Sequence, residues 1–230
     1  MTNRESEAYA ALVLVKTAQI REPFSVDWLK DRPDLQVGNF GIEVTRAIDS
    51  QQAEQCQIDS EALACPTYEI AHEYIRKLKY PEKYRSEPKQ LPGSNRFSLM
   101  SGGGYDDDKP LNLIVKAIAR KSKNFLQYPE YKRFLRRGLY ISDEDLHPNT
   151  APLSVELILK SINDSVFDVV FIHQRNNLIV VEKSSGIIQK YPFCILDRND
   201  TICESKRVVD SPDYEEFCER AKAYRESIGY

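Results

Sequence analysis

The segment DLQVGNFGIEVTRA, residues 34–47, constrains the fold more than any other part of the chain, because it predicts a β-hairpin with a fixed register. Gly38 and Asn39 suit a two-residue turn, since both residue types tolerate positive φ, which matches the twist of the flanking strands. A turn at these two residues pairs the strands so that Asp34 lies directly opposite Glu43.

The same register sorts the side chains of the hairpin onto two faces, because successive residues of a strand point to opposite sides. The apolar face, which we interpret as core, carries Leu35, Val37, Ile42 and Val44. The polar face carries Asp34, Gln36, Glu43 and Thr45. Two opposed carboxylates repel each other, and a hard cation such as Mg²⁺ would offset the repulsion. The alternative is an exposed pair of acids on a polar strand face.

Lys121 is a second unusual feature, because it falls on the apolar side of an expected helix over residues 111–128. The apolar arc of this helix contains Leu111, Ile114, Ala117, Ile118, Phe125 and Tyr128. Lysine is rarely buried without a partner, so Lys121 either reaches the surface with its long side chain or points into the pocket of Asp34 and Glu43. Lys116, Arg120 and Lys123 project elsewhere and are expected to be ordinary surface charges.

Other candidate groups carry weaker signals. Glu5 lies on the apolar line of the first helix and could reach the pocket, although a role in capping the helix with Thr2 is the simpler explanation. Glu7 points to the opposite side and is expected to be solvated. The three histidines are scattered, and the five cysteines form no close pairs, so a zinc site has little support. The acidic run 106–108 could bind a cation, but an acidic loop is the simpler expectation.

Length and composition predict one soluble domain over residues 1–230, with a helical and irregular insertion over residues 50–110. The odd number of cysteines and the lack of a long apolar run favour a cytoplasmic protein without a membrane segment. A net charge of −3 excludes a generally basic surface, so any contact with nucleic acid must be local. Three basic clusters with aromatic residues suit phosphate contact or, alternatively, are solvated helix faces: RKLKYPEKYR, KAIARKSKNF and YKRFLRR.

Sequence periodicity predicts strands that alternate with helices along most of the chain. We expect helices over residues 3–20, 111–128 and 154–163, strands over 24–30 and 137–142, a hairpin whose strands are joined by RNN at residues 175–177, and a final helix that begins at Ser211 and Pro212.

The sequence R-P-D-L, a short hairpin and then G-I-E-V-T-R-A together resemble the motif of the PD-(D/E)XK nuclease superfamily. The usual signature has a lysine two residues after the second acid, where this chain has Thr45. Some branches of the superfamily are similar in having E-V-T on the strand and the lysine on a following helix, a position that Lys121 suits. The resemblance covers about residues 3–47 and 111–142.

The resemblance implies an α/β, restriction-endonuclease-like fold with a central mixed sheet flanked by helices. It also implies that Asp34 and Glu43 hold Mg²⁺ or Mn²⁺, with the backbone carbonyl of Val44 as a further ligand. Lys121 would orient the attacking water or stabilise the transition state, and Glu5 would assist the metal or the water. The implied activity is metal-dependent hydrolysis of phosphodiester bonds, with DNA as the expected partner and a homodimer as one way to cut both strands.

Two alternatives stay open at this point. The first is a regulatory protein that binds nucleic acid or protein on the same fold without cleavage, because fold does not imply function and Thr45 replaces the usual lysine. The second is an interaction module such as an immunity protein. Convergence of Lys121 on Asp34 and Glu43 would favour the enzyme.

Overall fold

The computed structural model describes most of the chain, and two compact units can be distinguished in it. One unit comprises residues 1–47 and 110–230, and the other comprises residues 48–109. The described residues are 3–22, 24–47, 67–76, 88–90, 97–99, 109–142, 155–174, 177–193 and 195–210.

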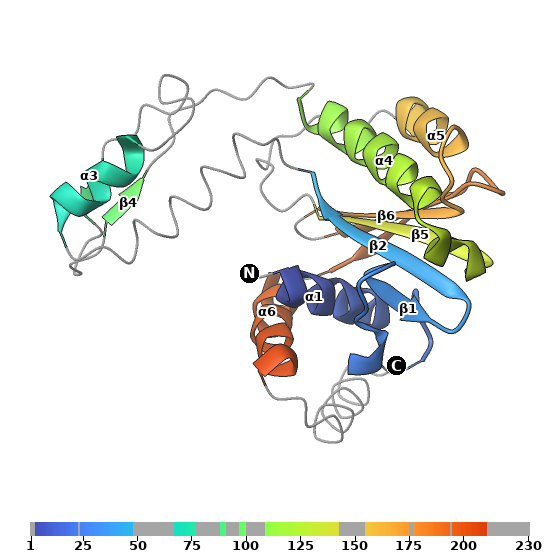
Figure 1. Ribbon diagram of the computed structural model, residues 1–230, viewed down its shortest axis with the longest axis horizontal. Coiled ribbons are helices and arrows are strands. Elements are labelled where there is room, and N and C mark those ends of the chain that lie inside the picture. Colours follow the sequence, from blue (N-terminus) through green and yellow to red (C-terminus); the bar gives the residue numbers. More distant parts are fainter. Residues whose placement is uncertain are drawn as a thin grey trace. The chain divides into compact units, whose positions relative to one another are not determined.

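The first unit is built on a six-stranded mixed β-sheet with the strand order β1-β2-β5-β6-β7-β8 (Figure 1). Strands β2, β5 and β6 run parallel to one another, and the remaining neighbours are antiparallel. The strands are β1 (Leu35–Val37), β2 (Phe40–Arg46), β5 (Arg136–Ser142), β6 (Val169–Gln174), β7 (Asn177–Glu182) and β8 (Ile188–Pro192).

Helices cover both faces of this sheet, and each pair of helices encloses its own apolar cluster (Figure 1). Helices α1 and α6 pack against each other on one face, and α4 and α5 lie on the other. The helices are α1 (Asn3–Lys16), α4 (Lys109–Gln127), α5 (Val155–Asn163) and α6 (Ile195–Asp210), with short 3₁₀ turns η1 (Val26–Trp28) and η2 (Pro129–Arg133). The expected α/β class, with a mixed sheet flanked by helices, is confirmed.

The register of the hairpin is confirmed for the three pairs within β1 and β2. Leu35 faces Ile42, Gln36 faces Gly41, and Val37 faces Phe40. Of the two turn residues only Gly38 has a positive φ, +57°. The apolar face of the hairpin packs in the α1 cluster, as expected. The opposite face of β2 is also covered, because Glu43 and Thr45 are buried on the side of α4.

The expected strand over residues 24–30 is wrong, because this segment forms the 3₁₀ turn η1. The Ser25 hydroxyl accepts a hydrogen bond from the backbone N–H of Asp27, which stabilises a turn at this point. The turn lets Phe24 and Trp28 pack edge to face, with ring centroids 5.5 Å apart. The turn therefore buries both aromatic rings in contact with each other.

Three of the other expected elements are confirmed, and the first helix is shorter than expected. The helices at 111–128 and 154–163 and the strand at 137–142 are confirmed as α4, α5 and β5, whereas the first helix ends at Lys16. The chain leaves that helix at Ala18, whose φ is +56°. Strand β8 and helix α6 were not expected, and the helix expected from Ser211 lies outside the described residues.

The second unit contains α3 (Tyr68–Arg76) and a short antiparallel pair, β3 (Pro88–Gln90) with β4 (Phe97–Leu99). On α3 the ring of Tyr68 stacks on that of His72 at 5.8 Å. The acidic run at 106–108 and four of the five cysteines lie outside the described residues, whereas Cys203 is exposed on α6. Within the described parts of both units, none of the helices combines the length and apolar character needed to cross a bilayer.

The packing of β2 predicts a large effect of shortening Ile42, which is fully buried under α1. We expect Ile42→Ala to lower the free energy of unfolding by about 2–5 kcal/mol, because it leaves a cavity in a close-packed cluster. Urea unfolding followed by circular dichroism measures this. Ile187→Ala is the matched control, since Ile187 is 49% exposed and should cost less than about 1 kcal/mol. Equal losses in both variants would contradict this account of the core.

Candidate active site

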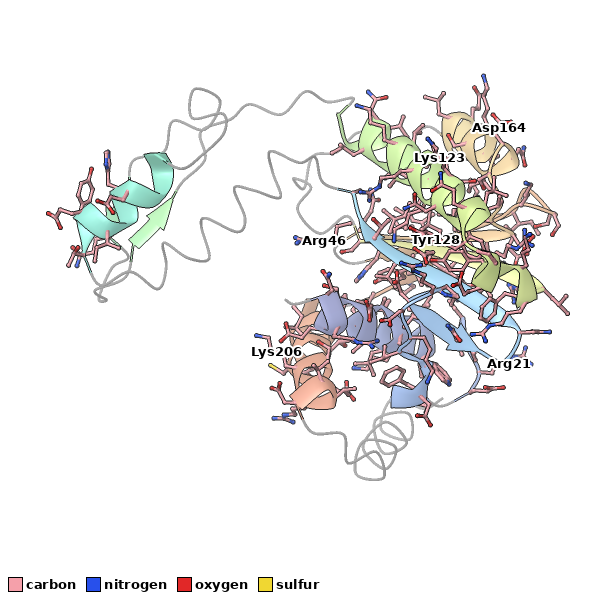
Figure 2. The ribbon with its side chains drawn as sticks, viewed as in Figure 1. Arg21, Arg46, Lys123, Tyr128, Asp164 and Lys206 are labelled. Atoms are coloured by element: carbon pink, nitrogen blue, oxygen red, sulfur yellow. The ribbon has the colours of Figure 1, made fainter. Side chains whose placement is uncertain are left out.

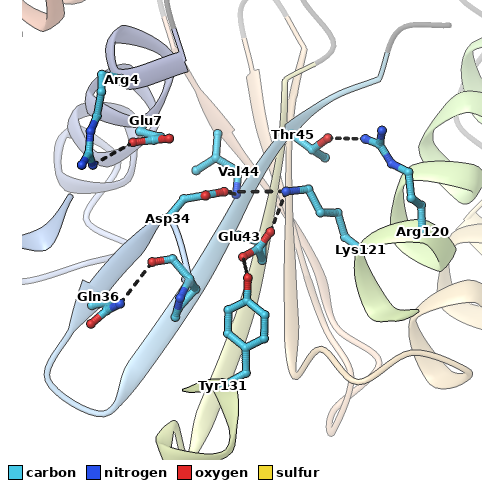
Figure 3. A network of polar contacts seen from close by, with 11 residues as sticks. Arg4, Glu7, Asp34, Gln36, Glu43, Val44, Thr45, Arg120, Lys121 and Tyr131 are labelled. Carbon is cyan, nitrogen blue, oxygen red and sulfur yellow. Dashed lines mark hydrogen bonds and ion pairs between the residues drawn. The ribbon is translucent and has the colours of Figure 1, made fainter. Parts of the chain in front are cut away.

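Glu43 is the most deeply buried member of a polar cluster beside β2 (Figure 3). Only 3% of the residue is exposed, and both carboxylate oxygens have donors. The Tyr131 hydroxyl donates to Oε1, and Lys121 Nζ donates to Oε2 at 2.6 Å. Strand alternation points Glu43 away from the apolar α1 cluster and toward α4, which carries Lys121.

Asp34 lies directly before β1 and joins the same cluster. Its Oδ2 accepts a hydrogen bond from the backbone N–H of Val44 at 2.7 Å. The same oxygen is 3.7 Å from Lys121 Nζ. Asp34 is thus fixed against the strand that carries Glu43, and the two acids share one lysine.

Lys121 reaches this cluster from α4 with a side chain that is 18% exposed. Figure 3 shows its ammonium group between the carboxylates of Asp34 and Glu43. The Lys121 side chain therefore points to the two acids and does not extend to the surface. The neighbouring lysines of the helix, Lys116 and Lys123, are exposed as expected.

Burial and charge crowding perturb the protonation of Asp34. Its pKa is raised from the usual 3.8 to about 6, chiefly by desolvation and then by the negative charge of Glu43. The positive charge of Lys121 and the Val44 N–H lower the pKa of Asp34 in part. The single ammonium group of Lys121 therefore does not fully offset the negative charge of the two acids.

Glu7 is a third acid beside this pair, and the expectation that it is solvated is wrong. Its side chain is 15% exposed and accepts a hydrogen bond from Arg4 at 3.2 Å. Burial and the charge of Asp34 raise the pKa of Glu7 from 4.5 to about 7. Glu5, the acid singled out from the sequence, lies half-buried in the first turn of α1. The helix therefore brings Glu7 within electrostatic reach of Asp34 (Figure 3).

Thr45, which stands where the nuclease motif has a lysine, is buried on the same face as Glu43. Its hydroxyl oxygen accepts a hydrogen bond from Arg120 Nη2 at 2.8 Å. Arg120 precedes Lys121 on α4 and was expected to be an ordinary surface charge. Two consecutive residues of α4 thus bond to alternate residues of β2: Arg120 to Thr45, and Lys121 to Glu43.

Tyr131, in η2, was not predicted as a site residue. Its ring stacks on Phe125 with centroids 4.0 Å apart, which holds the hydroxyl toward Glu43. Burial and the hydrogen bond to Glu43 raise the pKa of the Tyr131 phenol, so it remains a donor at neutral pH. A tyrosine within YKRFLRR gives no sequence signal for this contact, because its partner lies 88 residues away.

The cluster has the chemistry of hard oxygen ligands and a nearby ammonium group. Two carboxylates offer oxygen atoms, and Val44, whose carbonyl was expected to serve as a ligand, contacts Asp34 through its N–H. Over the parts of the chain that the structure describes, no three His, Cys, Asp or Glu side chains are grouped to form a complete metal cage. His173 is buried and pairs instead with the hydroxyl of Tyr140, a residue of the α1 cluster.

Comparison of the chain with models of protein families, with curated proteins and with solved structures finds no match.

The raised pKa of Glu7 predicts a stability gain when its charge is removed. A folded-state pKa above the unfolded value means that stability falls as the pH rises from about 4.5 to about 7. We expect Glu7→Gln to be more stable than wild type at pH 8 by on the order of 1–3 kcal/mol and equal to it at pH 4. Urea unfolding at both pH values measures this. Glu156→Gln, an exposed site on α5, is the control and should show no such pH dependence.

The contact of Tyr131 with Glu43 predicts that Tyr131→Phe leaves a buried carboxylate oxygen without its donor. We expect a loss of about 1–3 kcal/mol in the free energy of unfolding at pH 8. Tyr128→Phe is the matched control, because Tyr128 is a half-buried neighbour whose ring, not its hydroxyl, makes the described contacts. Equal stability of the two variants would mean that the phenol contributes nothing to holding Glu43.

Proposed function

We propose that this protein is a metal-dependent nuclease that hydrolyses phosphodiester bonds, most readily those of DNA. The observation that carries the proposal is the convergence of Lys121 on Asp34 and Glu43. Placing one buried and one partly buried acid next to a single lysine is costly, and such perturbed groups tend to gather at functional sites.

The topology supports a restriction-endonuclease-like core as the finer description of the fold. A mixed sheet places one acid on β2 and the other directly before the edge strand β1, and α4 supplies the lysine from one face. This is the arrangement that the resemblance to the PD-(D/E)XK superfamily implies. We also propose, from the thiol pattern of the sequence, that the protein is cytoplasmic, and a homodimer would supply the second site needed to cut a duplex.

The donor set fits Mg²⁺ or Mn²⁺. Asp34 and Glu43 supply carboxylate oxygens, which hard cations prefer, and the Val44 carbonyl is the proposed backbone ligand. The raised pKa values of Asp34 and Glu7 reflect burial first, and then negative charge nearby that Lys121 alone does not offset. A bound divalent cation would supply a water of lowered pKa and would neutralise charge on the phosphate.

The protein groups then have distinct tasks. Tyr131 donates a hydrogen bond to one oxygen of Glu43 and fixes the carboxylate. The other oxygen, which accepts from Lys121, would then be able to bind the cation. Lys121 can turn its ammonium group from the carboxylates to a phosphate oxygen, where it stabilises the charge that develops during hydrolysis. Glu7 is a further candidate for the part that the resemblance gives to Glu5, because the charge of Asp34 contributes to its raised pKa. It would assist the cation or hold the attacking water.

A second candidate function is supported by the same ion pairs. Lys121 already occupies the space between the two acids, and Thr45 is engaged by Arg120. A protein that binds nucleic acid or another protein without cleavage would keep this arrangement as a structural element. The two candidates differ in whether the cluster turns over a substrate.

Cleavage assays on plasmid, single-stranded DNA and RNA with Mg²⁺, Mn²⁺ or EDTA distinguish these candidates. We expect wild type to cut with the metal and not with EDTA. Asp34→Asn and Lys121→Ala should each lower the rate on the order of 100-fold or more, because they remove a ligand and a transition-state charge. The measurement is the initial rate of product formation on gels.

Lys123→Ala is the matched control, since Lys123 is exposed on the same helix and should retain full activity (Figure 2). Thermal melts establish that each variant is folded. Failure of pure wild type to cut any of the substrates with either metal would overturn the nuclease proposal and favour the non-catalytic candidate.

A further inference from the structure

We propose that an arginine face beside the two acids binds the phosphate backbone of a nucleic-acid strand and guides it to the site. We define the arginine face as Arg32, Lys132, Arg133 and Arg136, all of which are exposed. This inference deepens the nuclease proposal and rests on it. It assigns a substrate surface to residues on the loop before β1, on the segment that joins α4 to β5, and at the start of β5.

Aromatic rings hold the guanidinium groups of this face in place. The Arg32 guanidinium lies 4.0 Å from the centre of the Tyr128 ring, and that of Arg133 lies 4.8 Å from the Phe134 ring. Arg136 sits over Phe40 at 4.7 Å. Stacking restricts these long side chains before any ligand arrives, which lowers the entropy lost on binding while leaving N–H donors exposed.

The charges of this face are poorly compensated. Within the described part of the chain, no carboxylate lies within 4.0 Å of the charged groups of Arg32, Lys132 or Arg133. The adjacent Asp31 is 95% exposed and lies 3.7 Å from Arg4 instead. Arg136 has Glu182 at 3.7 Å, but both side chains are about half exposed, and such a pair contributes little.

The face is joined to the acids through Gln36, which follows Asp34 by two residues on β1. Arg133 Nη2 donates to Gln36 Oε1 at 2.5 Å, and Gln36 Nε2 donates to the backbone oxygen of Arg32 at 3.0 Å. Because Gln36 and Asp34 are two residues apart, strand alternation directs both side chains to the same face of the hairpin. The arginine face therefore continues the polar face of the hairpin rather than forming a separate patch.

Nucleic acid suits this surface better than an acidic protein segment. Planar guanidinium groups bind phosphate oxygens in pairs, and the strand carries phosphates at regular intervals that several cations can contact at once. Leu135, 81% exposed between Arg133 and Arg136, offers an apolar contact for a sugar or base. The chain as a whole has a net charge of −3, so contact with nucleic acid requires a locally basic surface such as the arginine face.

Fluorescence anisotropy with a labelled 30-nucleotide single strand and the matching duplex tests the proposal in EDTA, where no cleavage is expected. We expect Arg32→Ala and Arg133→Ala each to weaken binding on the order of fivefold at 0.1 M salt and to reduce the slope of log K against log salt by about 1. Lysine replacements at the same positions should keep most of the salt slope. Thermal melts check folding.

Arg207→Ala is the matched control, because Arg207 is an exposed arginine on α6 and should bind as wild type does. Wild-type affinity in both face variants would overturn the proposal, even if cleavage still depends on Asp34. Loss of binding in the variants supports it, even if wild type does not cut. Polyglutamate that binds as tightly as DNA and with the same losses would overturn the assignment to nucleic acid.

Discussion

The ion pair between Lys121 and Glu43 is the interaction on which the site depends. Glu43 is buried between β2 and α4, where an isolated carboxylate would be far too costly to keep ionised. Lys121 and Tyr131 occupy its two oxygens and so fix its rotamer. Asp34 then lies next to the same ammonium group, held by the Val44 N–H. Removing Lys121 would leave two neighbouring acids without their shared cation.

Local sequence signals were sufficient for the hairpin and for Lys121. A two-residue turn fixes every cross-strand pair, so placing Gly38 and Asn39 in the turn was enough to bring Asp34 near Glu43. Helical periodicity placed Lys121 on the inward side of α4 in the same way. Each of these inferences uses geometry that repeats over a few residues, which explains why they could be made without knowledge of tertiary contacts.

The contacts that complete the cluster depend on tertiary packing and gave no such signal. Tyr131 meets Glu43 because η2 turns the chain back under α4, and Phe125 then holds the ring in place. Helical periodicity identifies only the apolar side of α1, so it predicts that Glu7, on the opposite side, is exposed to solvent. Its environment includes Asp34, which approaches from the loop before β1. The expected strand at 24–30 is wrong because the segment forms a 3₁₀ turn, in which the backbone N–H of Asp27 bonds to the Ser25 hydroxyl.

The direction from which the lysine arrives has a physical consequence. A lysine on β2 at the position of Thr45 would share a face with Glu43 and extend along the strand, so its ammonium group would be tied to the sheet. Lys121 instead approaches from α4, and its long side chain spans the gap between the helix and the two acids. Because Arg120 holds Thr45, the helix is anchored to the strand independently of Lys121. In the nuclease that we propose, the ammonium group could then exchange a carboxylate for a phosphate without loosening the packing of α4 on the sheet.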